Sequence, residues 1–292
     1  MKNDKIAAAV DWGSSSFRAY RYDSVGQLVE KIDLSAGIKT LSNASFETVL
    51  LDNIGNWLQD GDAILLAGMI TSRDGWIETP YLKCPLSLHQ LAENSVRKNL
   101  SNGSTALFLP GVSAPMDVMR GEELQLYGSL TGDDQIVILP GTHSKWVYAR
   151  SGVLEQFHTV VTGELFDLLI NNSLIGGLAT STDWSELSFS NGVLDGFNSS
   201  AIISQLFSAR SGVLLEQLKA QDVHSYLSGL LIGNEIRESV KFYPDVPKLL
   251  VGTDSLLDRY QLAFELLGLE VKRGQGDAAA TGFQKLIKES RQ

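Results

Sequence analysis

Two segments of the chain, residues 6–34 and 135–161, repeat one order of elements, and this repeat constrains the fold more than any other feature. Each segment begins with an apolar strand, passes through a turn rich in glycine and hydroxyl residues, and continues into two further strands separated by a short turn. Strands joined by short Gly-centred turns typically form antiparallel hairpins. A meander that occurs twice predicts a chain built from two similar halves.

The rest of the chain alternates between helical and strand-like hydrophobic spacing. We predict helices over residues 46–59, 86–100, 163–178, 200–218, 223–240, 256–268 and 277–290, and short buried strands over 63–70, 248–253 and 269–274. No low-complexity linker separates the halves, so the turn composition over 128–134 and the repeat itself place the boundary. We therefore expect two domains, residues 1–129 and residues 130–292.

Length, charge and cysteine content narrow the class of protein. The chain has 292 residues, enough for two domains of ordinary size, each with its own core. Its formal net charge of -10 disfavours nucleic acid or an anionic membrane as partner, although a local basic pocket remains compatible with it. The single cysteine, Cys84, excludes an intrachain disulfide and a Cys-based zinc site. Because the apolar stretch at residues 6–10 is too short for a signal peptide or a membrane span, we expect a cytoplasmic protein.

The common nucleotide-binding signatures are absent or incomplete. A Walker loop needs Gly-Lys-Ser/Thr, and no glycine of this chain precedes a lysine. A Gly-x-Gly-x-x-Ala pattern occurs at Gly274, Gly276 and Ala279, but too little chain follows it for a dinucleotide-binding unit. A phosphate site in this chain would therefore have to be built in another way.

The turn of the first meander, "VDWGSSSFR" at residues 10–18, offers such a site. The backbone at Gly13 can approach an anion closely, and Arg18 can supply positive charge. Hydroxyl donors follow at Ser14, Ser15 and Ser16. Asp11 would repel a phosphate unless Mg²⁺ or its water shell lies between them. An Asx-type turn that merely ends the strand is the alternative.

The turn of the second meander, "LPGTHSKWV" at residues 139–147, has the same chemistry. Gly141 allows close approach, Lys145 is a candidate cation, and the donors are Thr142, His143 and Ser144. A plain turn with a solvated lysine is the alternative for this segment taken alone. Two such tips at the same place in a repeated meander favour the phosphate interpretation, because two facing tips could hold a polyphosphate between domains.

Two consecutive carboxylates, Glu122 and Glu123, begin the amphipathic segment "RGEELQLYG" at residues 120–128. Glutamates in a first helical turn are commonly explained by the helix dipole. The functional alternative is a general base, because phosphoryl transfer to a hydroxyl needs a carboxylate within hydrogen-bond reach of that hydroxyl.

Two further segments carry candidate ligand contacts. Polar and aromatic residues follow the predicted strand 63–70 and suit either a small polar ligand or a packed hairpin: Ser72, Arg73, Trp76, Glu78 and Tyr81. At the end of the strand 248–253, Gly252 and Thr253 could lie against a base or ribose. A plain helix cap would explain the same residues.

The order of these motifs resembles the sugar-kinase branch of the actin, heat-shock chaperone and hexokinase superfamily over nearly the whole chain. "DWGSSSFRA" is similar to the first phosphate hairpin of the FGGY carbohydrate kinases, and "RGEELQLYG" to the segment that carries their catalytic base, with Glu122 in place of Asp. "LPGTHSKW" falls at the second phosphate motif, and the segment from Gly252 to the last helix resembles the adenosine motif. The resemblance implies an α/β fold of two ribonuclease-H-like, actin-like ATPase domains with an ATP cleft between them.

Four longer strings, "VMRGEE", "LPGTHSKWV", "TGELFDLL" and "YLSGLLIG", resemble the 2-dehydro-3-deoxygalactonokinase family. This resemblance implies ATP-dependent phosphorylation of 2-dehydro-3-deoxy-D-galactonate on its C6 hydroxyl, in galactonate catabolism. The expected cofactors are ATP and Mg²⁺, and the expected partners are small molecules, with a homodimer left open. A kinase of the same fold for another sugar, sugar acid or polyol, and a non-enzymatic nucleotide-gated binding protein, are the alternatives.

On this hypothesis each candidate residue has a role. Glu122 accepts the hydroxyl proton, with Glu123 as the alternative base; Arg18 balances charge, and Asp11 orders the water shell of Mg²⁺. Residues 13–16 and 141–143 hold phosphates, and Gly252 and Thr253 border adenosine. The substrate is a carboxylate, so its site needs a cation, for which Arg73 is the first candidate and Arg120 the second. Ser72, Trp76 and Glu123 complete the substrate side. The galacto or gluco configuration of the substrate is not decided by the sequence.

Overall fold

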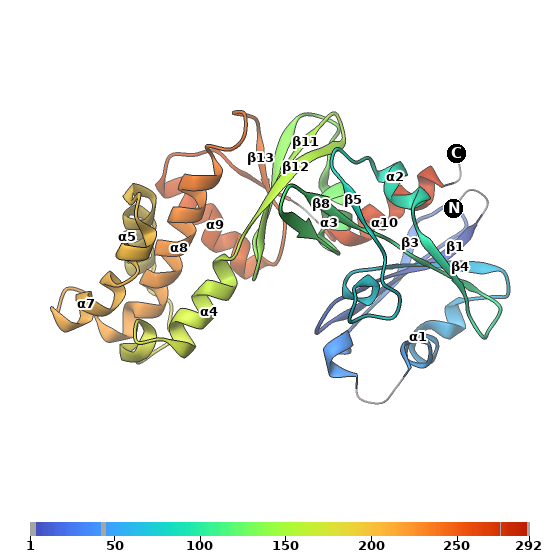
Figure 1. The fold of residues 1–292 in the computed structure, drawn as a ribbon, viewed down its shortest axis with the longest axis horizontal. Helices are drawn as coiled ribbons and strands as arrows, with labels where there is room; N and C mark the ends of the chain where they lie inside the picture. Colours follow the sequence, from blue (N-terminus) through green and yellow to red (C-terminus); the bar gives the residue numbers. More distant parts are fainter. Residues whose placement is uncertain (1–3, 42–44, 275, 291–292) are drawn as a thin grey trace. The chain divides into compact units, whose positions relative to one another are not determined.

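The computed structural model describes residues 4–41, 45–274 and 276–290. Contacts divide the chain into two compact units, whose elements are labelled in Figure 1. Unit 1 comprises the described residues up to Asp133, the segment Ala149–Gln156 and the described residues after Gly274. Unit 2 comprises Asp134–Tyr148 and Phe157–Gly274.

Unit 1 is built on a six-stranded sheet with the order β3-β2-β1-β4-β7-β6. β1 pairs antiparallel with β2 and parallel with β4, and β4 pairs parallel with β7. The apolar residues of β1 and β4 are buried, which is why both segments read as continuous hydrophobic runs in the sequence. The strands are β1 (Lys5–Trp12), β2 (Phe17–Tyr22), β3 (Leu28–Leu34), β4 (Asp62–Ala67), β6 (Val96–Asn99) and β7 (Thr105–Phe108).

Four helices and a small sheet complete unit 1. Ser45 caps α1 by accepting the Thr48 N–H, and Ser87 forms a capping box with Gln90 at the start of α2. The small sheet has the order β5-β8-β9. These elements are α1 (Phe46–Ile54), α2 (Leu88–Glu93), α3 (Glu122–Ser129), α10 (Ala278–Glu289), β5 (Tyr81–Lys83), β8 (Gly111–Ala114) and β9 (Asp117–Met119).

Helices α3 and α10 pack with their backbones in direct contact. A Cβ atom on Gly128 would overlap the carbonyl oxygen of Ala278, and one on Gly282 would overlap that of Leu124. Figure 1 shows the last helix beside α3, although more than a hundred residues separate them in the chain. This packing fixes the start of α3, where the two glutamates lie.

Unit 2 repeats the topology of unit 1 on a sheet with the order β12-β11-β10-β13-β14. β10 pairs parallel with β13, and β13 with β14. A meander followed by parallel strands thus occurs in both units, as the repeat in the sequence predicts. Strands β11 and β12 extend beyond unit 2, because their connected ends, Ala149–Gln156, belong to unit 1. The elements are β10 (Gln135–Leu139), β11 (Ser144–Arg150), β12 (Val153–Val160), β13 (Lys248–Leu250), β14 (Lys272–Arg273), α4 (Thr162–Asn172), α5 (Glu186–Asn198), α6 (Ile202–Gln205), α7 (Ser208–Leu214), α8 (Val223–Ser239) and α9 (Asp254–Leu266).

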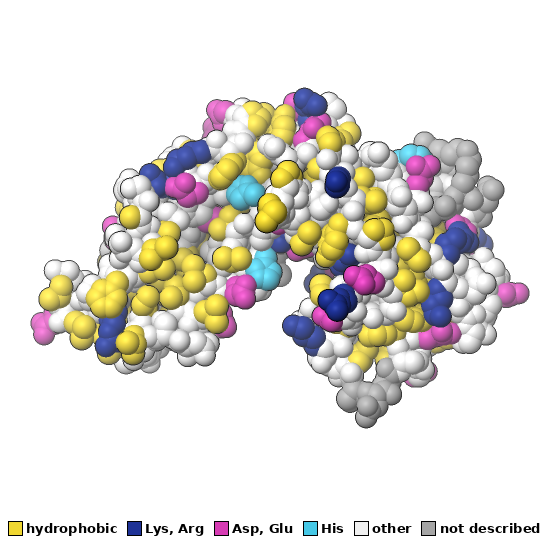
Figure 2. Space-filling model, viewed as in Figure 1, with side chains coloured by type: hydrophobic (Ala, Val, Ile, Leu, Met, Phe, Trp, Pro, Cys, Tyr) yellow, Lys and Arg dark blue, Asp and Glu magenta, His cyan; other side chains and the backbone are white. Residues whose placement is uncertain are grey.

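Short 3₁₀ turns connect several of these elements. They are η1 (Ile38–Thr40), η2 (Gly55–Trp57), η3 (Met69–Thr71), η4 (Gly176–Leu178) and η5 (Ala220–Asp222). Figure 2 shows hydrophobic side chains at the surface of the helical part of unit 2. Large exposed apolar residues there include Leu187, Ile203, Phe207, Leu214 and Leu215. Within the ranges that the structure describes, no helix combines the length and apolar character needed to cross a bilayer.

The structure differs from the sequence prediction in several elements: the helix predicted over 200–218 is divided into α6 and α7, and the strands predicted over 248–253 and 269–274 shorten to β13 and β14. The helix predicted over 86–100 ends at Glu93, and Val96–Asn99 form strand β6, with side chains that alternate between partly buried and exposed. The strand predicted over 63–70 ends at Ala67, because Gly68 adopts a φ of 92° and turns the chain. Helix α5 was not predicted, since Gly192 and Gly196 lower its helix propensity.

The division into units also differs from the expected domains. The chain passes from unit 1 to unit 2 after Asp133 rather than after residue 129, and α10 belongs to unit 1 rather than to a domain 130–292. The physical reason is the close packing of α10 on α3, which ties the end of the chain to its first half.

Helices α5 and α8 form the tightest helix pair of unit 2. Each carries two glycines four residues apart, Gly192 and Gly196 in α5 and Gly229 and Gly233 in α8. A Cβ on any of the four would overlap a carbonyl oxygen of the facing helix. Glycine is therefore required along both faces, and α8 is held as a rigid element close to the sheet.

We expect Gly196→Ala to destabilise the protein by about 1–3 kcal/mol, the usual cost of overpacking. The added methyl group would overlap the carbonyl oxygen of Leu230 and force the two helices apart. Urea unfolding followed by circular dichroism measures the change. Gly177→Ala is the matched control, because its nearest neighbouring atom would lie 4.0 Å from the new Cβ. Equal midpoints for the two variants would contradict this packing argument.

Candidate active site

Asp11 lies at the carboxyl end of β1, where three chain segments meet. A Cβ on Gly68, directly after β4, would come within 3.1 Å of Asp11 Oδ1, and one on Gly121, before α3, within 3.2 Å of Gly68 Cα. Gly68 and Gly121 have φ angles of 92° and 105°, which favour glycine. The backbone of both segments therefore closes around the Asp11 carboxylate, which is only 9% exposed.

The charge of Asp11 is balanced by Arg18 on the adjacent strand. Arg18 Nη1 lies 3.5 Å from Asp11 Oδ2. Burial raises the pKa of Asp11 to about 6; Arg18 opposes this rise, and the charges of Glu122 and Asp277 add to it. The structure thus brings together Asp11, Arg18 and Glu122, which the sequence analysis selected as one catalytic group.

The tip of the first hairpin is held by backbone hydrogen bonds. The Gly13 N–H donates to Ser16 O at 2.8 Å, and Gly13 O and Ser14 O accept from the N–H groups of Ile38 and Lys39, each at 3.0 Å. Gly37 packs so closely on the backbone of Ser14 and Ser15 that a Cβ would overlap it. The sequence analysis missed Gly37, because nothing in "SAGIK" indicates which distant turn it contacts.

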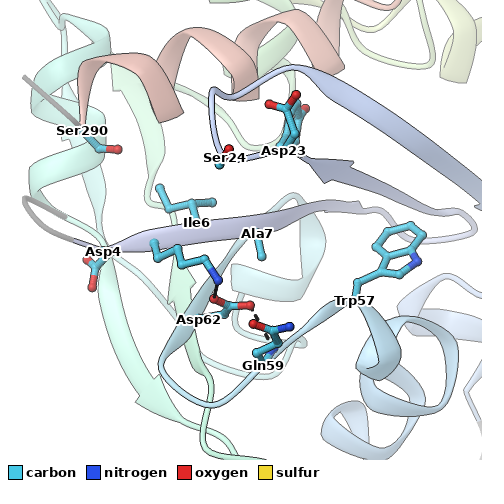
Figure 3. A pocket seen from close by; sticks show the side chains of 11 residues that line it. Asp4, Ile6, Ala7, Asp23, Ser24, Trp57, Gln59, Asp62 and Ser290 are labelled. Atoms are coloured by element: carbon cyan, nitrogen blue, oxygen red, sulfur yellow. Dashed lines mark hydrogen bonds and ion pairs between the residues drawn. The ribbon is translucent and has the colours of Figure 1, made fainter.

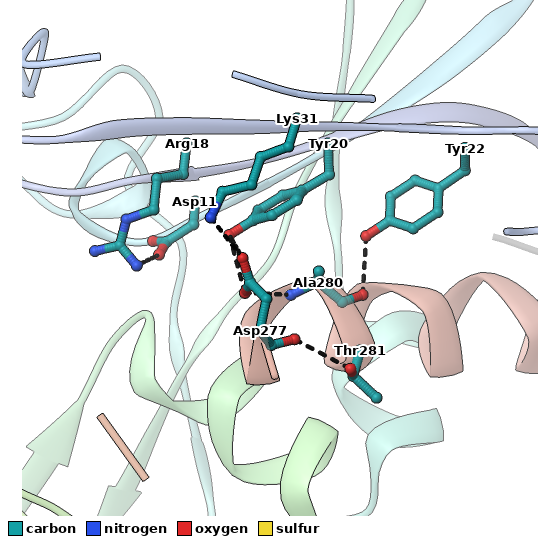
Figure 4. A network of polar contacts seen from close by, with 8 residues as sticks. All are labelled: Asp11, Arg18, Tyr20, Tyr22, Lys31, Asp277, Ala280 and Thr281. Atoms are coloured by element: carbon teal, nitrogen blue, oxygen red, sulfur yellow. Dashed lines mark hydrogen bonds and ion pairs between the residues drawn. The ribbon is translucent and has the colours of Figure 1, made fainter. Parts of the chain in front are cut away.

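A network around Asp277 supports the same hairpin from the start of α10 (Figure 4). Its carboxylate accepts from Tyr20 OH and from Lys31 Nζ, the latter at 2.7 Å, and caps the Ala280 N–H. Burial raises the pKa of Asp277, but the Lys31 hydrogen bond and the helix cap outweigh it and hold the pKa below its ordinary value. Strands β2 and β3 are thereby fixed to α10 by an ionised carboxylate.

The two glutamates at the start of α3 have different surroundings. Glu122 Oε2 accepts from the Arg120 N–H at 3.0 Å, and Glu123 Oε2 from the Gly121 N–H at 2.6 Å. Glu123 is 1% exposed, whereas Glu122 is partly exposed. Burial, and secondarily the charge of Glu122, raise the pKa of Glu123 to about 8. Of the two carboxylates, Glu122 is therefore the one that a ligand can reach.

The Arg120 guanidinium donates its hydrogen bonds to groups within the protein. Its Nη1 donates to Thr71 O, Thr71 Oγ1 and Thr79 Oγ1, each at 2.6 Å, and its Nη2 to Thr79 O at 2.9 Å. The guanidinium also lies over the Tyr81 ring, 4.3 Å from its centroid. Arg120 thus joins the start of α3 to residues 71–81 and has few donors left for a substrate carboxylate.

The other predicted substrate residues divide into packed and exposed groups. Ser72 donates its hydroxyl to Met69 O at 2.7 Å. Trp76 stacks on Phe46 and meets Phe108 edge-on, as the packing alternative predicts. Arg73 is exposed at the turn that follows β4. Ser72 and Trp76 therefore stabilise the turn after β4 by internal contacts, and the Arg73 side chain extends from this turn into solvent.

The second predicted tip lies in unit 2 and is open at its glycine. Among the described residues other than its two chain neighbours, none has a heavy atom within 4 Å of a Cβ built on Gly141. The neighbouring Thr142 O accepts the Glu164 N–H at 3.0 Å, and His143 Nε2 lies 2.7 Å from Glu164 Oε2. Gly163 at the start of α4 packs against Gly141 O and Thr142 Cα with no room for a side chain. Lys145 is buried rather than solvated.

A small cavity of about 60 Å³ adjoins this second tip. It is lined by Gly141, residues of α4 and α8, and Leu256, Arg259 and Tyr260 of α9. Thr253 occupies the N-cap position of α9 without a side-chain capping bond, and Gly252 lies beside Pro140. The residues predicted to border adenosine, Gly252 and Thr253, therefore lie at the start of a helix that lines the cavity. The Thr253 side chain does not form the capping hydrogen bond that the alternative interpretation expects of it.

A separate open pocket of about 640 Å³ lies at the amino ends of β1 and β4 (Figure 3). Asp62 there pairs with Lys5 Nζ at 2.7 Å and accepts the Gln59 N–H at 2.9 Å. Its lining contains no residue that the sequence analysis selected. The predicted site residues of unit 1 gather instead at the carboxyl ends of these strands.

The repeated meander, the parallel strands and the position of Asp11 define an actin-like fold of the kind found in sugar kinases. The ligand-bound xylulose kinase of Lactobacillus acidophilus shares this fold, with a TM-score of 0.50 and 8% identity over 97% of this chain and 89% of that chain. The predicted fold class is confirmed.

Closer relatives identify the family. The family model described as 2-keto-3-deoxy-galactonokinase matches residues 11–286. The 2-dehydro-3-deoxygalactonokinase of Escherichia coli (strain K12) is 36% identical over 278 residues, which cover 93% of each chain. A crystal structure of a protein of this family from Sinorhizobium meliloti has a TM-score of 0.86 and 32% identity over 96% of each chain. The chain belongs to the 2-keto-3-deoxy-galactonokinase family, as the sequence motifs predicted.

We expect Glu123→Gln to flatten the pH dependence of stability. The folded-state pKa of about 8 exceeds the ordinary 4.5, so the folded protein keeps a proton that the unfolded chain releases. The free energy of unfolding of the wild type therefore falls as the pH rises from 4.5 through 8, whereas glutamine is neutral throughout. Urea midpoints measured at about pH 5, 7 and 9 test this. Glu122→Gln is the matched control, and parallel profiles for Glu123→Gln and the wild type would refute it.

Proposed function

We propose that this chain transfers the γ-phosphoryl group of ATP to the C6 hydroxyl of 2-dehydro-3-deoxy-D-galactonate. The observation that supports the proposal is the closure of Gly68 and Gly121 around Asp11, at the start of the helix on which Glu122 lies near enough for its charge to act on Asp11. Membership of a kinase family whose curated relative bears this activity in its name supports the choice of reaction.

Glu122 is proposed as the general base. It is partly exposed, and its charge influences Asp11. A carboxylate that accepts the proton of the attacking hydroxyl typically accelerates transfer by about 10²–10⁴-fold. Glu123 is buried and bonded to the backbone of Gly121, so we assign it to the support of this turn rather than to proton transfer.

The first hairpin is proposed to hold phosphate with its backbone N–H groups and the hydroxyls of residues 14–16. Arg18 would balance charge on the transferred group. One carboxylate, hydration water and substrate phosphates are an ordinary donor set for Mg²⁺, and the buried Asp11 fits that set. Bound Mg²⁺ would neutralise phosphate charge, while Asp11 would order its water.

Unit 2 is proposed to bind the rest of the nucleotide. Gly141 is open to an approaching phosphate, and Thr142 and His143 are exposed beside it. Gly252 and Thr253 would border adenosine together with the cavity lined by Leu256 and Arg259. We also propose a cytoplasmic location, which the single free thiol of Cys84 supports.

Arg73 is proposed to bind the carboxylate of the sugar acid. Its side chain is exposed at the turn after β4, whereas the Arg120 guanidinium already donates hydrogen bonds to Thr71 and Thr79. A guanidinium binds a carboxylate through two parallel hydrogen bonds, which also fixes the orientation of the acid. Ser72 and Trp76 would support the loop that presents Arg73.

A coupled assay of ADP release tests the function directly. The panel contains 2-keto-3-deoxy sugar acids of galacto and gluco configuration, neutral sugars and polyols. Activity with the galacto acid supports the proposal. Activity with neutral acceptors alone would favour another kinase of the same fold, and ATP binding without any acceptor-dependent ADP release would favour a nucleotide-gated binding protein.

We expect Glu122→Gln to lower kcat by about 10²–10⁴-fold, the contribution of a positioned base. The KM for ATP should change little, because the amide keeps the size of the side chain and its bond from the Arg120 N–H. Steady-state kinetics at saturating ATP measure the effect. Glu123→Gln is the comparison, and a greater loss of turnover in that variant would reverse the assignment of the base.

We expect Arg73→Ala to raise the KM for the sugar acid by about 10–100-fold, the loss of a charge-assisted hydrogen-bonded pair. The KM for ATP should stay near the wild-type value. Arg21→Ala is the matched control, because Arg21 is also exposed on unit 1 but pairs with Glu30 at 3.2 Å. An unchanged acceptor KM in Arg73→Ala would remove Arg73 from the substrate site.

A further inference from the structure

Glu235 is a buried carboxylate in α8 for which the proposed reaction has no direct use. It is 2% exposed and lies in the hydrophobic core of unit 2. Its Oε1 accepts the Trp146 Nε1–H at 2.8 Å, and its Oε2 accepts the hydroxyls of Tyr260, at 2.6 Å, and Thr162. Burying a carboxylate is costly unless hydrogen-bond donors replace its lost hydration. Three donors surround this one side chain and supply that replacement.

One of these donors begins a chain of hydrogen bonds that ends at the second hairpin tip. Tyr260 OH lies 3.1 Å from Ser144 Oγ, and Ser144 Oγ accepts the Gly141 N–H at 3.3 Å. Tyr260 donates its one hydroxyl hydrogen to Glu235, so its oxygen accepts from Ser144. The lone pairs of Ser144 Oγ are then directed to the Gly141 backbone. Burial raises the pKa of Glu235, and the hydrogen bonds that it accepts oppose this rise.

A second route leads from the same carboxylate to the other side of the tip. Thr162, the first residue of α4, donates its hydroxyl to Glu235 Oε2. The next residue, Gly163, packs against Gly141 O and Thr142 Cα, and the Glu164 N–H donates to Thr142 O at 3.0 Å. Both arms of the tip, Gly141 and Thr142, are therefore tied to one side chain on α8.

Glu235 is itself rigidly placed. The glycine-lined contact of α8 with α5 reaches Gly233, two residues before Glu235, where a Cβ would overlap Val193 O. The backbone that carries Glu235 is therefore held close to α5. The carboxylate is fixed to the helix pair on one side and to the tip on the other.

We propose that Glu235 is a positioning residue for the nucleotide, which sets the Gly141 N–H and the Thr142 backbone through Tyr260, Ser144 and Thr162. This inference rests on the proposed function, because it takes residues 141–143 to bind the phosphates of ATP. It adds a buried determinant of ATP affinity that does not touch the ligand.

Tyr260→Phe is the first test, because it removes the central hydroxyl of the chain and keeps the aromatic ring. We expect a five- to tenfold increase in the KM for ATP and in the dissociation constant of a non-hydrolysable ATP analogue, about the loss of one hydrogen bond. The KM for the sugar acid should not change, which distinguishes positioning from general destabilisation. Tyr226→Phe is the matched control, because Tyr226 lies in the same unit and its OH donates to Asp195 Oδ2 at 2.7 Å, outside the chain of hydrogen bonds that joins Glu235 to Gly141.

Ser144→Ala and the double variant Ser144→Ala/Tyr260→Phe keep the proposal testable if one variant folds poorly. The losses of ATP affinity should not add, because both substitutions break the same series of hydrogen bonds. The double variant should therefore lose no more ATP affinity than the weaker-binding single variant. Full additivity, or an unchanged ATP affinity in both single variants, would overturn the proposal.

Gly141→Val separates this inference from the proposed function. The substitution has open space around its Cβ, so the protein should fold, but the side chain would occupy the approach to the backbone N–H groups. Weaker ATP binding in Gly141→Val with unchanged binding in Tyr260→Phe would overturn the role of Glu235 alone. Unchanged ATP binding in Gly141→Val would overturn both the nucleotide role of the tip and the inference built on it.

Discussion

The absence of two side chains, at Gly68 and Gly121, is the constraint on which the candidate active site depends. A Cβ at Gly68 would lie 2.8 Å from Trp12 O and 3.1 Å from Asp11 Oδ1. A Cβ at Gly121 would lie 3.2 Å from Gly68 Cα. Only this approach lets the ends of β1 and β4 and the start of α3 share one small volume. Larger residues would separate Asp11 from Glu122, whatever else the fold preserved.

The two units reach a similar hairpin tip by different physical means. In unit 1 the tip is held by backbone hydrogen bonds from Ile38 and Lys39 and by the close packing of Gly37. In unit 2 it is held through hydroxyl side chains that lead to the buried Glu235. The repeated meander therefore constrains the strand topology and the location of the tips, but not the contacts that make each tip rigid.

This difference explains how much of the molecule could be predicted from the sequence. Meanders, tips and the adjacent glutamates are local patterns, and each was located correctly. The packing of α10 on α3, the pairing of α5 with α8 and the bonds of Arg120 to Thr71 and Thr79 join segments far apart in the chain, and no local pattern encodes them. For the same reason the sequence makes Arg120 a candidate to bind the substrate carboxylate, and it gives no sign of the contacts made by Gly37 and Glu235.

Charge near the first tip bears on how a phosphate could bind there. Asp11, Glu122 and Asp277 all place negative charge in this region of unit 1. Two cations of this region lie against carboxylates, Arg18 against Asp11 and Lys31 against Asp277. A bare polyphosphate would meet net repulsion, whereas a nucleotide that arrives with Mg²⁺ brings the missing positive charge with it.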